Sequence, residues 1–183
     1  MLSREERAHV REVIGDLMVH PVALEMKKYI QHGDVSTYDH ALAVTYRAYE
    51  MARKKLSRLN ERALLRAAFL HDLYLYDWHD PDPSHKWHGF HHARRAAGNA
   101  VRIFGVSELE RRIIDSHMWP LNPERIPHCR EGWILTLADK WVSTLETLTR
   151  GSVLPPEERS TVPDGGQSAS ETQTTTETDG TKE

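Results

Sequence analysis

Histidine and aspartate side chains interrupt apolar helical segments at widely separated points of this sequence. His71 and Asp72 directly follow the apolar run AAFL, and His40, His117 and Asp139 each lie three or four residues from aliphatic side chains. A buried charge is costly unless it is paired. A divalent cation would compensate buried carboxylates and accept neutral imidazoles at once. Mixed His/Asp ligation without thiolate suits iron, manganese or zinc in a catalytic site with open coordination positions.

Taken one at a time, these residues also fit ordinary structural roles. A buried histidine is usually a hydrogen-bonded core residue, and a buried aspartate is usually a cap or one half of an ion pair. That explanation has to be repeated on five predicted helices, whereas a metal accounts for all of them together. The helix expected from residue 89 adds His91 and His92 as neighbouring candidates. The single cysteine, Cys129, excludes a disulfide framework and a multi-cysteine zinc site.

The elements that must position these side chains are predicted to be helices, which makes the fold class all-α. Apolar residues recur at helical spacing and no segment shows sustained strand-like alternation. Ser36 or Thr37, Asn60 and Ser107 are candidate N-caps, and Gly105 is a helix stop. The helices are expected at residues 4–19, 22–31, 37–56, 63–76, 89–104, 108–118 and 131–149, with a proline-containing loop at 76–88.

The composition changes near residue 150. Residues 151–183 contain 11 Ser or Thr, no aromatic residue, and seven acidic against two basic side chains, a net charge of −5. Such a segment has too little apolar surface to offset the entropy of ordering. We therefore expect one helical domain over residues 1–150 and a disordered acidic tail over residues 151–183.

Charge and hydropathy exclude several classes of protein. The formal net charge of −3 argues against binding of a nucleic-acid polymer, which usually requires a basic excess. No apolar run reaches the roughly 18 residues that span a membrane. The N-terminus is charged from residue 4 and does not resemble a secretory signal. A cytoplasmic protein is expected, and the sequence leaves its oligomeric state open.

The order of the polar residues along the chain resembles that of the HD superfamily of metal-dependent phosphohydrolases, over about residues 20–147. The residues that carry the resemblance are His40, His71, Asp72, a histidine at 91 or 92, His117 and Asp139. The chain looks most like the variants in which five helices supply six ligands to a two-metal centre. Bacterial HD-type diadenosine tetraphosphate hydrolases, inositol oxygenases and phosphonate-cleaving oxygenases share that arrangement.

The resemblance implies a role for each matching residue. His40, His71, Asp72 and Asp139 would hold the first metal, with His71 and Asp72 as the catalytic pair. His92 and His117 would hold the second metal, and Asp72 would bridge the two. His92 is preferred to its neighbour His91 because Ala96, four positions later, fits the family pattern. The implied cofactor is a pair of divalent transition-metal ions, with iron preferred and manganese or zinc as alternatives.

The chain departs from the family at one position. Many HD hydrolases carry a lysine that contacts phosphate three residues after the aspartate of the His-Asp pair, and here that position is Leu75. Other side chains must then meet the substrate. The candidates for substrate binding are Lys140, Arg94, His91, His79 and Lys86.

The reaction that the resemblance implies is hydrolysis of a phosphomonoester or phosphoanhydride of a small metabolite, preferably a nucleotide, by a metal-activated hydroxide. Two alternatives stay open. A di-iron centre with the same ligands would activate oxygen instead, and a non-catalytic module would bind a nucleotide without turnover. Oxygen consumption separates the first alternative from a hydrolase, because hydrolysis needs no oxygen.

Overall fold

The computed structural model of the protein describes residues 2–76 and 88–160, and its regular structure is almost entirely helical. The α-helices are α1 (Arg4–Met18), α2 (Pro21–Glu25), α3 (Thr37–Ala52), α4 (Glu61–Leu70), α5 (His88–Phe104), α6 (Glu108–Ser116) and α7 (Arg130–Thr149). Shorter elements are the 3-10 helices η1 (Met26–Lys28), η2 (Arg53–Arg58) and η4 (Pro156–Glu158) and the strands β1 (Ile30–His32) and β2 (Val35–Ser36). The predicted all-α class is confirmed.

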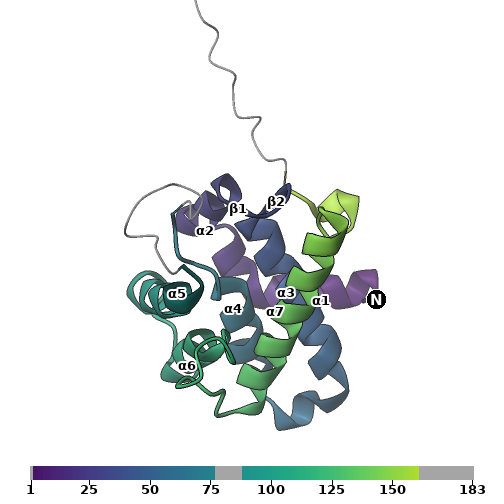
Figure 1. The fold of residues 1–183 in the computed structure, drawn as a ribbon. Coiled ribbons are helices and arrows are strands. Elements are labelled where there is room, and N and C mark those ends of the chain that lie inside the picture. The colour runs from purple at the N-terminus through teal and green to yellow at the C-terminus, as the bar shows by residue number, and fades with distance from the viewer. Residues whose placement is uncertain (1, 77–87, 161–183) are drawn as a thin grey trace, which may run out of the picture.

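Helix α3 lies at the centre of the fold and packs against both α4 and α7 (Figure 1). Helices α5 and α6 pack on each other, α6 also packs on α4, and α1 covers another side of α4. The shared core consists of fully buried aliphatic side chains, among them Val44, Leu64, Leu65, Ile114 and Leu135. Each such side chain contributes about 1.5–3 kcal/mol by leaving water. None of the described helices combines the length and the apolar character needed to cross a membrane.

The predicted helix caps are present. The side chains of Ser36, Asn60 and Ser107 each accept a hydrogen bond from the backbone N–H three residues later, at 3.1, 3.0 and 3.3 Å. Each cap satisfies a donor that the first turn of a helix leaves unpaired. Gly105 has a positive φ of 57°, which glycine adopts without strain, and α5 ends at the preceding residue.

The predicted second helix is shorter than expected, and a small hairpin replaces its second half. Residues 22–31 divide among α2, η1 and β1, and β1 pairs antiparallel with β2 so that Ile30 lies opposite Ser36. Gly33, with φ of 55°, lies in the reversal between the strands. Two strands of three and two residues are too short for alternation to show in a sequence. The hairpin matters because it carries Gln31 into the interior.

Helix α4 ends at Leu70, six residues earlier than predicted. The Nδ1 atom of His71 donates a hydrogen bond to the carbonyl oxygen of Ala68 at 2.8 Å, which stabilises the chain's exit from the helix. Leu75 then has a positive φ of 59°, a region that side chains rarely adopt and that no helix contains. His71 and Asp72 therefore stand at the end of a rigid buried helix. The predicted loop that follows lies outside the described residues from 77 to 87.

The domain extends beyond its predicted end at residue 150. The described residues 151–160 pack against the helices instead of beginning a disordered tail. Leu154 is buried in the main core, and the Glu158 carboxylate lies 2.8 Å from Nε of Arg7 on α1. The sequence analysis missed this segment because one buried leucine and one ion pair leave little trace in an average composition.

Ser160, at the end of this segment, is hydrogen-bonded to Asp39, the residue before the candidate ligand His40. Its backbone N–H donates to Oδ1 of Asp39 at 3.0 Å, and its hydroxyl donates to the same oxygen at 2.7 Å. Asp39 directly precedes His40 in the first turn of α3. The rest of the predicted tail, residues 161–183, lies outside the described residues.

Two truncations should separate the docked segment from the remainder. Deletion of residues 161–183 should leave the melting temperature unchanged. Deletion of residues 152–183 should lower it by several degrees, because losing a buried leucine alone costs about 2–5 kcal/mol. Leu154→Ala should reproduce most of the loss, and Glu157→Ala, at an exposed neighbouring position, should not. Equal melting temperatures for both truncations would show that residues 152–160 do not dock.

Candidate metal centre

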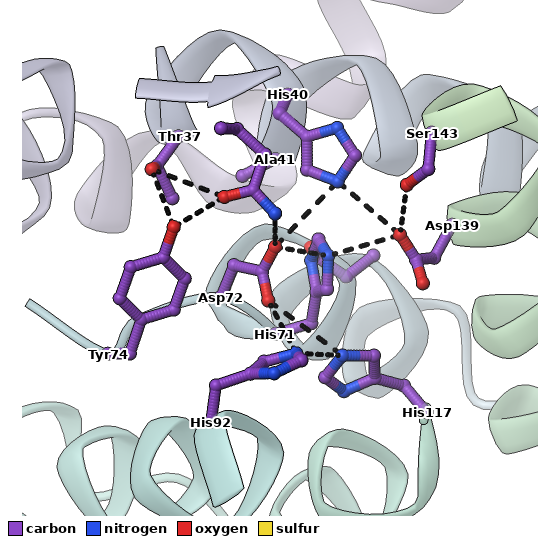
Figure 2. Close-up of polar contacts among 12 residues, drawn as sticks. Thr37, His40, Ala41, His71, Asp72, Tyr74, His92, His117, Asp139 and Ser143 are labelled. Carbon is purple, nitrogen blue, oxygen red and sulfur yellow. Dashed lines mark hydrogen bonds and ion pairs between the residues drawn. The ribbon is translucent and has the colours of Figure 1, made fainter. Parts of the chain in front are cut away.

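Five helical regions bring the six predicted ligands together in the interior (Figure 2). All six side chains are buried. His40 lies in the first turn of α3, His71 and Asp72 follow α4, His92 lies near the start of α5, His117 caps the C-terminus of α6, and Asp139 lies midway along α7. Residues separated by about a hundred positions in the sequence thus face one another.

The Asp72 carboxylate lies between two groups of imidazoles. Its Oδ2 atom is 3.3 Å from Nε2 of His71 and 3.7 Å from Nε2 of His40. Its Oδ1 atom is 3.3 Å from Nε2 of His92 and 3.8 Å from Nε2 of His117. Each carboxylate oxygen therefore faces a different pair of histidines, and the side chain joins the two pairs.

Asp139 completes the group of side chains around Oδ2 of Asp72. Its Oδ1 atom lies 3.4 Å from Nε2 of His40 and 3.8 Å from Nε2 of His71. The hydroxyl of Ser143, one helical turn later, donates to the same oxygen at 3.0 Å. Two carboxylates and two imidazoles converge here, and this is the donor set that Fe, Mn or Zn accepts.

Hydrogen bonds at the far nitrogens orient the imidazoles. Nδ1 of His71 donates to Ala68 O, and Nδ1 of His117 donates to Ile114 O, both at 2.8 Å. In the neutral form that binds a metal each ring carries one N–H, so these bonds leave the lone pair on Nε2, which points into the centre. Metal-ligating histidines typically have such a partner for the second nitrogen.

His40 is oriented by a carboxylate instead. Its Nδ1 atom donates to Oε2 of Glu146 at 2.7 Å, and both side chains are fully inaccessible to solvent. Glu146 lies seven residues after Asp139, two turns along the same side of α7. A carboxylate behind a histidine fixes the ring and raises the basicity of its other nitrogen. Helix α7 therefore supplies both a candidate ligand and the residue that orients another.

Asp72 is held in place by the hairpin. The Gln31 side-chain amide donates to Asp72 Oδ2 at 2.8 Å. The Gln31 carbonyl oxygen accepts from the hydroxyl of Tyr74, which lies 3.1 Å from Oγ1 of Thr37. This buried chain of hydrogen bonds fixes the plane of the carboxylate, and so determines which oxygen faces which pair of histidines.

The residues present fit a divalent cation. Within the described structure, Nε2 of His71 and Oδ1 of Asp72 are buried and make no well-aligned hydrogen bond, although such atoms normally do; each has only a longer contact at 3.3 Å, with Asp72 Oδ2 and His92 Nε2 respectively. Nε2 of His92 lies 3.1 Å from Nε2 of His117, whose lone pair faces it, so this contact needs a proton or a cation between the rings. Three sets of three ligand atoms lie within 4.8 Å of one another: His40–His71–Asp72, His71–His117–Asp139 and Asp72–His92–His117.

The carboxylates are ionised throughout the physiological range. Burial alone would raise the pKa of Asp72, but the charge and hydrogen bonding of His71 and His92 hold this pKa well below its usual value. Burial likewise works against ionisation of Asp139, and hydrogen bonds from His40 and His71 lower its pKa well below the usual value. Two buried negative charges are thus available to a cation.

Two of the histidines have pKa values shifted in opposite directions. Burial lowers the pKa of His40, but the hydrogen bonds to Asp139 and Glu146 outweigh burial and raise this pKa to about 9. Burial and the neighbouring His71 lower the pKa of His117 to about 3. In the absence of a metal His40 is therefore charged at neutral pH and His117 is neutral, and a metal bound by both would displace a proton from His40.

A cavity of about 350 Å³ opens onto this centre. Four of the candidate ligands line it, Asp72, His92, His117 and Asp139, and the remaining lining residues are Gln31, Gly89, Met118, Lys140, Ser143 and Thr144. Its size lies in the range of small-molecule sites. Lys140 is half-buried, donates to the carbonyl oxygen of His117 at 3.4 Å, and has a pKa lowered by burial. It is the only lysine or arginine among the described lining residues.

The predicted substrate-binding residues lie in different places. Lys140 lines the cavity, as its position next to Asp139 suggested. Arg94 is exposed and lines a separate depression with Arg111 and Arg125, and the structure does not bring it to the cavity. His91 is exposed and is not among the lining residues, whereas its neighbour His92 is buried at the centre. His79 and Lys86 lie outside the described residues.

The sequence analysis missed three polar residues next to the centre. Glu146 had a detectable signal, because its spacing from Asp139 and Val142 places a carboxylate on the buried face of α7. Ser143 is four residues after Asp139 and had the same signal. Gln31 had none, because the segment was expected to be helical and only the hairpin turns this amide toward Asp72.

Replacing Glu146 by Gln should lower metal affinity by about 10–100-fold with little loss of folding, because the ring of His40 loses its anionic partner but keeps a neighbour of the same shape. Titration calorimetry with Mn²⁺ or Zn²⁺ measures the change. Glu12→Gln, at an exposed position on α1, is the matched control and should bind as the wild type does. Unchanged affinity in the Glu146 variant would rule out this orienting role.

The metal-free protein should lose stability as pH rises from about 6.5 to about 9. The folded-state pKa of His40 is raised from 6.5 to about 9, so its stabilising charge is fully present below the lower value and is lost through the upper one. By linkage, the loss from His40 is roughly 3 kcal/mol. Urea denaturation across this range tests it, and His40→Gln should make the profile shallower without abolishing it, because the pKa of His71 is also raised well above its usual value. Stability that stays constant or increases with pH would contradict the assignment.

Comparison with known protein families agrees with the arrangement of these residues. The family model of the HD domain matches residues 37–142, from the first turn of α3 into α7, and this range includes all six clustered histidines and aspartates. No curated protein and no solved structure matches the chain. The family match covers more than half of the sequence, so the chain belongs to the HD domain family, which consists in general of metal-dependent phosphohydrolases.

Proposed function

We propose that the protein is a two-metal phosphohydrolase. His40, His71 and Asp139 would hold one divalent ion together with Oδ2 of Asp72. His92 and His117 would hold the other with Oδ1 of Asp72. The observation that carries the proposal is the position of Asp72, with one oxygen toward each pair of histidines. Because Oδ1 and Oδ2 face different pairs of histidines, one ion for each pair would use both oxygens of the carboxylate.

The charges around the cavity favour an anionic substrate only when cations are bound. Asp72 and Asp139 contribute two negative charges to the lining, and Lys140 contributes one positive charge. Without bound cations, the two carboxylates would repel an anion. Two divalent ions would reverse the local charge, and Lys140 would then pair with a phosphate oxygen from the side. Lys140 would thus do the work of the family lysine whose position is occupied by Leu75.

When bound, two metal ions supply an activated hydroxide and stabilise the charge on the phosphoryl oxygens. The chain's own residues orient the reactants. Asp72 joins the two ligand groups and is itself fixed by Gln31. Ser143 donates to Asp139, so its hydroxyl is not poised for attack. Cys129 caps α7 through a contact with the Gly132 N–H and is absent from the described cavity lining, so no cysteine nucleophile serves the site.

The substrate class that we favour is a small phosphorylated metabolite, with nucleotides as the first group to test. The cavity volume of about 350 Å³ suits a ligand of this size, and Gly89 and Met118 give part of its wall an uncharged surface. Trp119 does not line the cavity, and its ring packs against Trp133 at 4.9 Å between centroids. A base would therefore have to stack elsewhere.

The experiment begins with metal analysis of protein purified without oxygen, followed by phosphate release from nucleotides and sugar phosphates with Fe²⁺, Mn²⁺ or Zn²⁺. We expect two ions for each chain, and release that stops when a chelator is added. Asp72→Ala should lose both ions, and His117→Ala should lose mainly one.

Variants of two cationic residues then test whether the substrate binds in the cavity or elsewhere on the surface. Lys140→Met should raise KM for phosphate substrates by roughly tenfold with a smaller effect on kcat, as expected for lost substrate binding. Arg94→Met is the control and should leave both constants unchanged. If turnover requires oxygen, the protein is a di-iron oxygenase and the proposed hydrolase function is wrong. A metal-loaded protein without turnover on any phosphate substrate would indicate a binding module.

A further inference from the structure

The outer face of α7 carries a row of exposed apolar side chains. Trp133, Leu137, Trp141 and Leu148 are 36%, 52%, 44% and 75% exposed. Their spacing of four, four and seven residues places them on one side of the helix, and we call them the α7 stripe. Single exposed apolar residues are common, but two tryptophans and two leucines aligned on one helix form a patch of the kind found at interaction sites.

The surface on the α3 side of the stripe is hollowed at both ends of α7. Near the C-terminal half, Trp141 borders a mainly apolar depression that includes Tyr46 and Leu154. Near the N-terminal half, Trp133 borders a second depression that includes Met51 and Leu59. Figure 1 shows α7 lying across the outside of the bundle with no other described element over it. The stripe is therefore a ridge with room for apolar side chains beside it.

The charges that border the stripe beside Trp133 are positive. Arg58 and Arg130 are exposed and line the depression there. Neither arginine forms a salt bridge with another described residue. Beside Trp141 the Arg47 guanidinium lies over the ring, 4.1 Å from its centroid, and is paired with Glu50, which lines the same depression. An apolar, aromatic centre with charged residues at its rim is the usual composition of a protein–protein interface.

The acidic residues of α7 do not balance these cations. The helix contains three, Glu131, Asp139 and Glu146, and all three are buried. The exposed face of α7 therefore presents apolar and cationic groups without a carboxylate of its own. A partner that supplies carboxylates along its edge would complement this face, and the charge would also raise the rate of association.

We propose that the α7 stripe binds an acidic amphipathic helix of another protein. The helix would place its apolar face on the stripe and into the two depressions, and its glutamates or aspartates would pair with Arg58 and Arg130. An amphipathic helix fits because the apolar anchors of the stripe recur at helical spacing along a straight ridge. This surface does not depend on the proposed reaction, since none of its residues is a candidate ligand.

A second copy of this chain fits the surface less well. A second copy would present the same α7 face, on which none of the acidic residues of the helix is exposed, so it would offer no α7 carboxylate to Arg58 and Arg130. In a parallel pair each arginine would also approach its own equivalent, which opposes association.

The chain's own acidic tail also fits less well. Residues 161–183 carry five acidic side chains and one lysine, so their charge is suitable. Val162 and Ala169 are their only aliphatic side chains, however, and the segment has no aromatic residue. It would leave most of the tryptophan and leucine surface in water, whereas an amphipathic helix would cover it.

A synthetic helical peptide tests the proposal on the full chain. The probe has leucines at every third and fourth position on one face and glutamates at both edges of that face, and the control peptide has lysine in place of each glutamate. Titration calorimetry should show that the glutamate peptide binds at least tenfold more tightly than the lysine peptide, and that added salt weakens its binding. Equal affinities, or no binding of the glutamate peptide, would overturn the proposal.

Matched variants locate the binding surface. Leu137→Gln should weaken binding of the glutamate peptide at least tenfold with an unchanged melting temperature, and Val101→Gln, at a residue of similar exposure on α5, should not. The double variant Arg58→Glu with Arg130→Glu should weaken binding to a similar extent, and Arg94→Glu on α5 should not. Loss of binding in either control, or full binding by both stripe variants, would place the peptide elsewhere and overturn the proposal.

Two further measurements decide between the possible occupants. Sedimentation velocity of the full chain should show a monomer from low to high micromolar concentration. A dimer that Leu137→Gln dissociates would assign the stripe to a second copy and overturn the proposal. Deletion of residues 161–183 should leave the affinity for the glutamate peptide unchanged. Tighter binding after this deletion would make the chain's own tail the occupant and would also overturn the proposal.

Discussion

The structure depends on an ionised carboxylate, Asp72, buried at the junction of five helical regions. A charge removed from water is tolerated only when other groups compensate it. Imidazoles from α3, α5 and α6 and from the end of α4 lie around this one side chain, together with the Gln31 amide from the hairpin. Helices α3 to α7 are thus the elements whose polar side chains meet at the centre of the fold.

Much of this architecture was predictable from the spacing of residue types. Helices with apolar stripes and standard caps follow from local rules, and the caps at Ser36, Asn60 and Ser107 occur as expected. His40, His71, Asp72, His117 and Asp139 were identifiable because they are polar residues on faces that must be buried. The choice of His92 over His91 rested on one small residue, Ala96, and the structure buries His92 at the centre.

The features that the sequence did not reveal depend on contacts between distant residues. The hairpin has two strands too short for a periodic signal, and Gln31 acquires its role only through the tertiary structure. The early end of α4 reflects a bond from the His71 side chain to its own helix. Residues 151–160 dock through a few specific contacts, such as that of Ser160 with Asp39, which an average over a polar segment conceals.

The wide separation of the candidate ligands along the chain has a consequence for folding. The first is His40 and the last is Asp139, so no short segment of the unfolded chain can assemble the set. Metal ions would therefore bind the native state almost exclusively, and their binding free energy would add to global stability. Each tenfold excess of free metal over its dissociation constant would add about 1.4 kcal/mol per site. Because the centre forms only after α3 and α7 meet, metal would slow unfolding far more than it would accelerate folding.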